Sequence, residues 1–431
     1  MLAIVVPNSV CWTRFERASL GRWSYACLSW LFRGTNRFWH DLFQARVRVI
    51  LERYRIIAGI AVVDDTDNPR SKTTTRLSKT YRLHHKPSGG TVNGQSLVFL
   101  VLVTPRVTIP VGLELYMPAP AITAWNTQDR LLKQRGVPAK ERPSKPLPDP
   151  RYPTKQEIAL DLLAAFRGHF PQVSLRGTLA DTLYGTAEVL DTASLITGGK
   201  QVVSQIRKNQ HVRFRGNEMA VETYFRRHPG VPFPISIRGG ATQPVIVSSA
   251  RLYVCAQKTK RVVIALQYEG EAEPRYLVAV DLSWRTLDIV QVYTCRWLVE
   301  VVIQDWSSYE GWRQLAKHPD EDGSRRSLIL SLLGDHCLLL HPEQSARLDH
   351  NLPACPVGSL CDVIKMESLM QCLWEIVSSE DPVNEFEKLA IRAKEVFSVR
   401  DSSKHMVGRD LGRLEPTPSL KSHARVMMNA A

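Results

Sequence analysis

The sequence lacks the features of a membrane protein, a disulfide-stabilised protein or a zinc protein. No apolar run approaches the ~20 residues that cross a bilayer, and the apolar residues 1–6 have no basic segment ahead of them, so we expect neither an anchor nor a signal peptide. The eight cysteines form no Cys-x2-Cys pair, so neither the usual zinc pattern nor a disulfide framework is indicated. We expect a cytoplasmic protein.

Acidic residues are also in short supply. Asp and Glu number 42 against 56 Lys and Arg, a formal net charge of +14. Such a surplus favours a polyanionic partner, because basic surfaces attract phosphates and release their counterions. A basic protein with no nucleic-acid role is the alternative that charge alone leaves open. With 431 residues and 44% apolar composition, we expect a globular chain of two or three domains.

The patterns along the chain divide it into five regions. The N-terminal region is rich in Arg and aromatic residues, which predicts helices that either contact DNA or form an ordinary core. Within the second region, residues 126–153 carry six prolines between Pro138 and Pro153 and predict an exposed linker. The predicted regions are 1–55, helical and basic; 56–197, the first part of a catalytic core; 198–285, a β-rich insertion; 286–345, the completion of the core; and 346–431, a helical C-terminal region with a basic tail.

The second region predicts a mixed sheet. Three apolar runs with short connections, 56–63, 96–103 and 107–116, favour antiparallel strands. A helix with a capping box begins at Thr154, and a fourth strand, 173–180, follows it. A right-handed crossover would lay the fourth strand beside the first. We therefore predict an α/β fold with the ribonuclease-H-like plan, interrupted by the β-rich insertion.

Acidic residues follow two of these strands directly. Asp64 and Asp65 end the first strand and Asp181 ends the fourth, so Asp64 and Asp181 should lie together. Neighbouring buried carboxylates stay ionised only when cations lie between them, and such hard oxygen ligands suit Mg²⁺. Two such ions can activate a water or a 3′-hydroxyl for attack on a phosphodiester. Asp65 is the alternative first acid, because adjacent strand residues point to opposite sides.

A third carboxylate is predicted on a helix. Tyr293 and Glu300 are seven residues apart, about two turns, so they are nearly in line, and Arg296 lies within about 60° of that line. This face would offer a carboxylate to a metal and a guanidinium to a phosphate. The alternative is an ordinary surface ion pair between Arg296 and Glu300 at i,i+4 spacing.

Four features together resemble a large group of DDE transposases of bacterial insertion sequences. The run Val62-Val63-Asp64-Asp65-Thr66 is similar to the group's first-Asp strand, and Ala180–Gly185 is similar to its second-Asp motif. Residues 293–300 resemble its Tyr-x2-Arg-x3-Glu signature. A β-rich insertion between the second and third acids is also characteristic. The resemblance implies a ribonuclease-H-like core and cut-and-paste DNA transposition.

The resemblance also implies a site, a cofactor and partners. The implied cofactor is Mg²⁺, for which Mn²⁺ can substitute. The implied partners are double-stranded DNA at terminal inverted repeats, target DNA, and a second copy of the chain in a homodimer on paired ends. The implied catalytic and metal-binding residues are Asp64, Asp181 and Glu300, and the DNA-binding or supporting residues are Tyr293, Arg296, Lys72 and Tyr184.

The sequence departs from this group at Ser307. Relatives carry a Lys there, seven residues after the Glu, and its loss weakens a phosphate contact but not metal ligation. The region before the first Asp is also short for the group. Three hypotheses follow: an active transposase, a catalytically impaired remnant that only binds DNA, or a different enzyme with paired carboxylates, such as a glycosidase.

Overall fold

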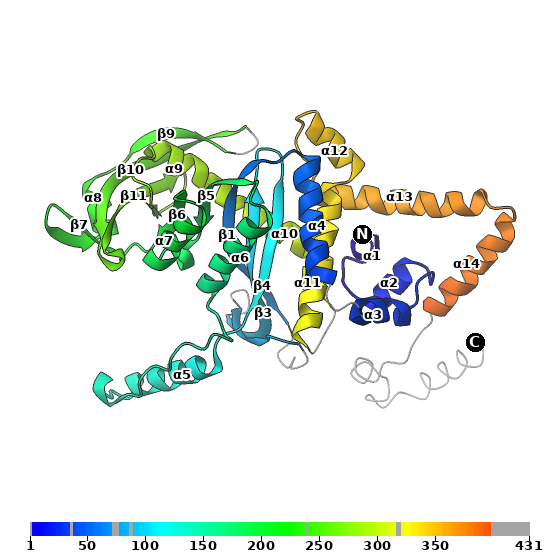
Figure 1. The fold of residues 1–431 in the computed structure, drawn as a ribbon, viewed down its shortest axis with the longest axis horizontal. Coiled ribbons are helices and arrows are strands. Elements are labelled where there is room, and N and C mark those ends of the chain that lie inside the picture. Colours follow the sequence, from blue (N-terminus) through cyan, green and yellow to red (C-terminus); the bar gives the residue numbers. More distant parts are fainter. Residues whose placement is uncertain are drawn as a thin grey trace, which may run out of the picture.

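The computed structural model describes residues 2–34, 38–70, 77–85, 89–237, 240–315 and 320–397. Across these ranges none of the helices combines the length and apolarity that crossing a bilayer requires. Figure 1 shows a sheet with helices beside it, a second set of strands at one end, and slender helices that extend from the body. The polar C-terminal tail expected in the sequence lies outside the described residues.

The centre of the fold is a five-stranded arrangement in the order β4-β3-β1-β5-β6. Strands β1, β3 and β4 pair antiparallel, whereas β5 pairs parallel with β1 and β6 parallel with β5. This order and these directions are the ribonuclease-H-like plan, so the predicted fold class is confirmed. The strands are β1 (Ala58–Pro69), β3 (Gly90–Val103), β4 (Thr108–Tyr116), β5 (Ser174–Ala180) and β6 (Gln201–Ile206), with β2 (Tyr81–His85) paired to β3.

The central strands are apolar because both faces of the sheet are covered. On β3, every residue from Gln95 to Val103 is buried, and the continuous apolar run from Leu97 to Val103 is typical of a strand between two layers. Helix α6 (Lys155–His169) contacts β1, β3 and β4, and α7 (Ala187–Ile196) contacts β5 and β6. Helices α4 (Phe38–Arg53), α10 (Trp297–Tyr309) and α11 (Glu321–Leu339) lie on the other side of the strands (Figure 1).

The predicted start of α6 is confirmed in detail. The Thr154 hydroxyl accepts from the Glu157 N–H, and the Glu157 carboxylate accepts from the Thr154 N–H. Each side chain thus satisfies a backbone donor that the first helical turn leaves unpaired. This cap fixes where the crossover helix begins, and so it fixes the position of Lys155 in its first turn.

The β-rich region extends the same sheet. Strand β12 pairs antiparallel with β6, and the order continues β11-β10-β7-β8, with β9 also paired to β10. Strand β6 lies within the 198–285 range but belongs to the central arrangement through its parallel pairing with β5. The remaining elements here are β7 (His211–Phe214), β8 (Asn217–Ala220), α8 (Val221–Arg227), β9 (Val231–Ser236), β10 (Thr242–Val254), β11 (Thr259–Tyr268) and β12 (Arg275–Ala279).

One outer helix, α5, lies partly within a segment that the sequence predicts to be a linker. Residues 126–153 were expected to form a linker throughout, but α5 (Pro120–Gln134) covers the first part of that range. The reason is that no proline lies between Pro120 and Pro138, and proline is well tolerated at the first helical position. The other outer helices are α1 (Leu2–Val5), α2 (Trp12–Ala18), α3 (Tyr25–Gly34), α9 (Thr286–Tyr293), α12 (Pro342–Asp349), α13 (Val357–Val377) and α14 (Pro382–Val396).

A stack of aromatic rings joins the sheet to α10. The Trp306 ring lies between Phe99 of β3 and Trp312, with centroid distances of 5.4 and 4.5 Å and interplanar angles of 10°. Its indole N–H donates to the Ser331 hydroxyl on α11 at 2.7 Å. Trp306 is fully buried, so it packs the helix that bears Glu300 against the central strands.

We expect Trp306→Ala to lower the free energy of unfolding by about 3–5 kcal/mol, because it removes the ring from between two others and leaves a cavity. Urea unfolding followed by circular dichroism measures this change. Trp30→Ala is the matched control, since Trp30 is 74% exposed and its loss should change stability by about 0.5 kcal/mol or less. Equal effects of the two substitutions would contradict the packing described.

A buried histidine makes stability depend on pH. His336 of α11 donates from Nε2 to the Pro110 carbonyl oxygen at 2.9 Å and stacks on Phe43. Burial lowers the pKa of His336 to about 4 from its ordinary 6.5. The unfolded chain therefore takes up this proton at a higher pH than the folded protein. The contribution of His336 to stability is complete above about pH 6.5 and is lost as the pH falls toward 4.

We expect the wild type to lose up to about 3 kcal/mol more than His336→Phe when the pH falls from about 7 to about 4. The phenyl ring keeps the stacking position but cannot take up a proton. Unfolding free energies at the two pH values give the comparison. His350→Gln changes an exposed histidine and should follow the wild type; parallel pH profiles for wild type and His336→Phe would refute the assignment.

Candidate active site

The acids predicted from the sequence lie where β1 and β5 separate. The parallel pairing of these strands ends with Val63 opposite Ala180, and Asp64 and Asp181 are the residues that directly follow these two. Beyond that point β1 keeps only its β3 partner. The two strands therefore stop pairing at the point where each bears a carboxyl group, Asp64 on β1 and Asp181 directly after β5.

The Asp64 carboxyl group is largely buried, and its polar contacts only partly offset the cost of burying its charge. Its side chain is 13% exposed, and one carboxylate oxygen accepts from the Asp65 N–H at 2.8 Å. Burial raises the pKa of Asp64 to about 7, and the nearby Asp181 raises it too, while the Asp65 N–H and Arg296 oppose the rise. A carboxyl group in this situation becomes fully ionised only when more positive charge approaches it.

Arg296 connects Asp64 with the third predicted acid. Its guanidinium donates to Asp64 Oδ2 at 3.2 Å and to Glu300 Oε1 at 2.5 Å. The Arg296–Glu300 pair has the i,i+4 spacing of a surface ion pair, but the Arg296 side chain is only 11% exposed while Glu300 is 49% exposed. The same arginine thus joins β1 to α10, which a simple surface pair would not do.

Asp181 occupies the start of a short 3₁₀ turn, Thr182–Tyr184. Its carboxylate accepts from the Leu183 N–H at 2.9 Å, and its carbonyl accepts from the Ser204 hydroxyl of β6 at 2.5 Å. Burial raises the pKa of Asp181, and the nearby Asp65 adds to the rise. Gly185 ends the turn, and a Cβ there would collide with the Gln205 carbonyl oxygen. This contact explains the glycine of the second-Asp motif.

Tyr184 supplies an unpaired hydroxyl near the acids. Its side chain is 1% exposed, and among the described residues its phenol oxygen has no hydrogen-bond partner. Burial raises the pKa of the Tyr184 phenol, and the charges of Asp65, Asp181 and Asp64 raise it further. A phenol placed among carboxylates in this way can donate a hydrogen bond but resists ionisation.

Tyr293 reaches the same region through β6. Its phenol oxygen accepts from Gln205 Nε2 at 2.7 Å, and Gln205 Oε1 accepts from the Thr182 hydroxyl at 3.2 Å. Burial raises the pKa of Tyr293 to about 12. The Arg296 guanidinium lies 6.0 Å from the centre of the Tyr293 ring. Through Gln205, Tyr293 therefore ties α9 to the turn that carries Asp181.

Asp65 has a different partner from Asp64. Its carboxylate forms an ion pair with Lys155 of α6 at 2.6 Å, whereas Asp64 contacts Arg296 at the start of α10. No motif in the sequence points to Lys155 or Gln205. Lys155 lies in the first turn of a capped helix, but no sequence pattern relates it to an acid 90 residues earlier.

The donor set suits a divalent cation in its chemistry. The two aspartates carry carboxyl groups with raised pKa values, so additional positive charge would stabilise their ionised forms, and the Tyr184 hydroxyl has no hydrogen-bond partner among the described residues. Within the ranges that the structure describes, no three His, Cys, Asp or Glu side chains are grouped closely enough to hold a metal ion. The Arg296 guanidinium bridges Asp64 and Glu300 instead.

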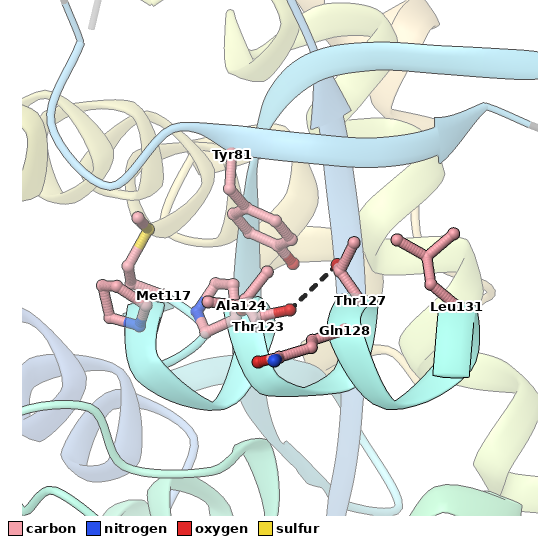
Figure 2. Close-up of a pocket in the computed structure, with 9 residues that line it drawn as sticks. Tyr81, Met117, Thr123, Ala124, Thr127, Gln128 and Leu131 are labelled. Atoms are coloured by element: carbon pink, nitrogen blue, oxygen red, sulfur yellow. Dashed lines mark hydrogen bonds between the residues drawn. The ribbon is translucent and has the colours of Figure 1, made fainter. Parts of the chain in front are cut away.

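Two other predicted features add nothing to this geometry. Lys72 lies outside the described residues, so no position is assigned to it. Ser307 is half-buried on α10 and brings no cation. A cavity of about 650 Å³ lies elsewhere, between Tyr81, Met117 and the first turns of α5. Figure 2 shows its lining, in which no carboxylate takes part.

We expect Arg296→Gln to raise the pKa of Asp64, because the substitution removes the cation that opposes the effect of burial. Carbon-13 NMR of Asp-labelled protein without divalent ions measures the titration. Arg325→Gln is the control, since Arg325 pairs with Glu114 and Glu321 and should leave the Asp64 midpoint in place. An unchanged Asp64 midpoint in Arg296→Gln would show that the bridge is not formed in solution.

Comparison with known proteins identifies the family. No curated protein matches the chain. Among solved structures, the chain resembles a piggyBac transposase synaptic complex with hairpin DNA, at 11% identity and a TM-score of 0.43, covering 94% of this chain and 76% of that one. It also resembles the NurA nuclease from Sulfolobus solfataricus, at 8% identity and a TM-score of 0.20, covering 69% and 86%.

The family match itself covers more than half of the sequence. The model of the family described as "DDE superfamily endonuclease" matches residues 35–270. That range contains β1, β5 and the two aspartates that follow their paired segments, while Glu300 lies beyond it. The predicted membership in a DDE group is thereby confirmed: this chain belongs to the DDE superfamily of endonucleases.

Proposed function

We propose that the protein is a DNA transposase that cuts at the ends of a mobile element and joins the 3′-hydroxyl to target DNA. The observation that carries the proposal is the meeting of Asp64 and Asp181 at the point where β1 and β5 separate, with Glu300 connected to Asp64 by Arg296. The family match favours phosphodiester chemistry over a glycosidase.

In this proposal Asp64, Asp181 and Glu300 hold Mg²⁺, and Mn²⁺ can replace it. The bound ions would supply activation of the attacking oxygen and stabilisation of the leaving oxygen. Positive charge near the two aspartates would bring their pKa values down toward ordinary carboxylate values, because it offsets the cost of burial. The DDE superfamily membership supports a divalent cofactor, and the choice of magnesium rests on the oxygen donor set.

The other side chains would bind and orient the DNA. Arg296 offers two N–H groups, the arrangement that suits a phosphate. Gln205 hydrogen-bonds both Tyr293 and Thr182, so it connects α9 to the turn that carries Asp181. Tyr184 offers a hydroxyl donor to an oxygen that enters between the acids. We assign Asp64 rather than Asp65 as the first acid because Asp64 shares Arg296 with Glu300.

We expect Asp64→Asn, Asp181→Asn and Glu300→Gln each to reduce nicking of terminal-repeat DNA by on the order of 1,000-fold or more, because each removes a metal ligand. The assay follows Mg²⁺-dependent nicking of duplexes that carry the inverted repeats flanking the gene. Asp362→Asn is the control, since Asp362 lies on the exposed side of α13 and should leave nicking unchanged.

Asp65→Asn decides between the two candidate first acids in the same assay. We expect it to retain most nicking, because Asp65 pairs with Lys155 and does not contact Arg296. Full activity in Asp64→Asn together with loss in Asp65→Asn would reverse the assignment. Full nicking activity in any one of the variants Asp64→Asn, Asp181→Asn and Glu300→Gln would show that the proposed triad is wrong.

Ser307 favours a second candidate function, a remnant that binds DNA without cutting it. Such a protein would show binding that weakens steeply with salt and no nicking under any divalent ion. Binding and nicking assays on the same purified protein separate the two proposals.

We also propose that the protein acts as a homodimer on paired ends, which a measurement of its size in solution tests. We propose further that the chain is divided into the five regions 1–55, 56–197, 198–285, 286–345 and 346–431, which limited proteolysis tests.

A further inference from the structure

Residues 120–153 form a compact arm that projects from the body. Figure 1 shows α5 extending away from the sheet, and most of its residues are exposed. Gly136, with a φ of +77°, follows the helix and reverses the chain. The Pro-rich segment then returns along α5, because the Trp125 indole N–H donates to the Pro143 carbonyl oxygen at 2.7 Å.

A buried ion pair fixes this arm in one shape. Asp129 of α5 is only 8% exposed and pairs with Arg142 of the returning segment at 2.6 Å and with Lys133 at 2.8 Å. A carboxylate buried on a projection needs such compensation. The arm is therefore a pre-organised unit, which a flexible proline-rich linker would not be.

Both ends of the arm are anchored beside the acids. Tyr116, at the end of β4, precedes it, and Lys155, at the start of α6, follows it. The Lys155 ammonium lies 5.3 Å from the Tyr116 ring centre and 2.6 Å from Asp65 Oδ2. The arm thus begins and ends next to the residue that adjoins Asp64.

The arm presents free positive charge. Residues 120–153 contain seven Lys or Arg against three Asp or Glu. Within the described part of the chain, four of these cations form no ion pair, and all four are exposed. The four are Arg130, Arg135, Lys140 and Lys145. Exposed, unpaired cations on a pre-organised support are complementary to a phosphate backbone.

We propose that the arm of residues 120–153 binds the phosphate backbone of duplex DNA beside the scissile position. This inference rests on the proposed function, because it takes DNA to be the substrate at the acids. Helix α5 has 15 residues and so is about 22 Å long, which corresponds to about six base pairs. The contacts are to phosphates, so the arm adds affinity without reading sequence.

The test compares the salt dependence of DNA binding. The probe is a random-sequence duplex of about 40 base pairs, and the association constant is measured by fluorescence anisotropy between about 50 and 200 mM KCl. The full chain carrying Arg130→Gln, Arg135→Gln, Lys140→Gln and Lys145→Gln together is compared with the wild type. If each cation neutralises one phosphate, the slope of log K against log salt falls by about 3.6.

A second variant controls for net charge. Lys200→Gln, Arg227→Gln, Lys258→Gln and Lys260→Gln together remove four exposed cations of α7's C-terminal loop and the β-rich region. The proposal expects the arm variant to lose at least about two units of slope and the control variant to lose less than half as much. A smaller loss in the arm variant, or equal losses in both, overturns the proposal.

Nicking separates this proposal from the proposed function. If the arm variant still nicks terminal-repeat DNA at saturating protein but binds with an unchanged salt slope, the arm proposal is wrong and the transposase proposal stands. If the wild type binds no duplex DNA, both are wrong. If the arm variant instead changes the sedimentation of the free protein while its salt slope stays the same, the arm joins two copies of the chain and the DNA assignment is overturned.

Discussion

The constraint on which this structure depends is the cost of placing carboxylates where the buried, paired part of β1 and β5 ends. Asp64 follows a run of residues that the sheet and two helix layers keep from water, and its neighbourhood contains two further aspartates. Electrostatics in such a setting favours the neutral acid unless cations are near. Within the described ranges, the cations that pair with these acids are Arg296 and Lys155, one from each side of β1.

The two cations also organise the elements around the sheet. Arg296 lies where α9 passes into α10, so its contact with Asp64 ties the late part of the chain to the first strand. Lys155 does the same for the crossover helix through Asp65. Because neighbouring residues of a strand point to opposite sides, the pair Asp64-Asp65 can receive one cation from each layer. Each of the two adjacent acids therefore pairs with its own cation, Asp64 with Arg296 and Asp65 with Lys155.

The arm, residues 120–153, joins the sheet beside the acids of the site. The chain leaves the sheet at Tyr116 and returns at Lys155, and the contact between these two residues closes the base of the projection. The arm's own stability comes from Asp129 with its two cations and from the Trp125 hydrogen bond. Four further exposed cations of the arm form no ion pair within the described ranges, and these are the charges that the proposal assigns to a partner.

The sequence by itself determined the central strands, the capped helix and the acids that follow the paired part of β1 and β5, although β1 itself continues past Asp64 to Pro69 beside β3. These followed from local patterns: apolar runs of strand length, the Thr154–Glu157 capping box, and polar residues directly after buried ones. Parallel pairing of β1 with β5 needed only the rule for crossover connections. The fold class and the adjacency of Asp64 and Asp181 were therefore predictable.

The tertiary structure alone decided which side chains meet across long separations. The pairing of Lys155 with Asp65 and the link from Gln205 to Tyr293 left no recognisable local signal. Such contacts depend on the register of strands and on the angle at which helices cross them, and neither is encoded by residue spacing. A local pattern specifies an element, whereas the partner of a charged side chain is fixed only when the layers pack.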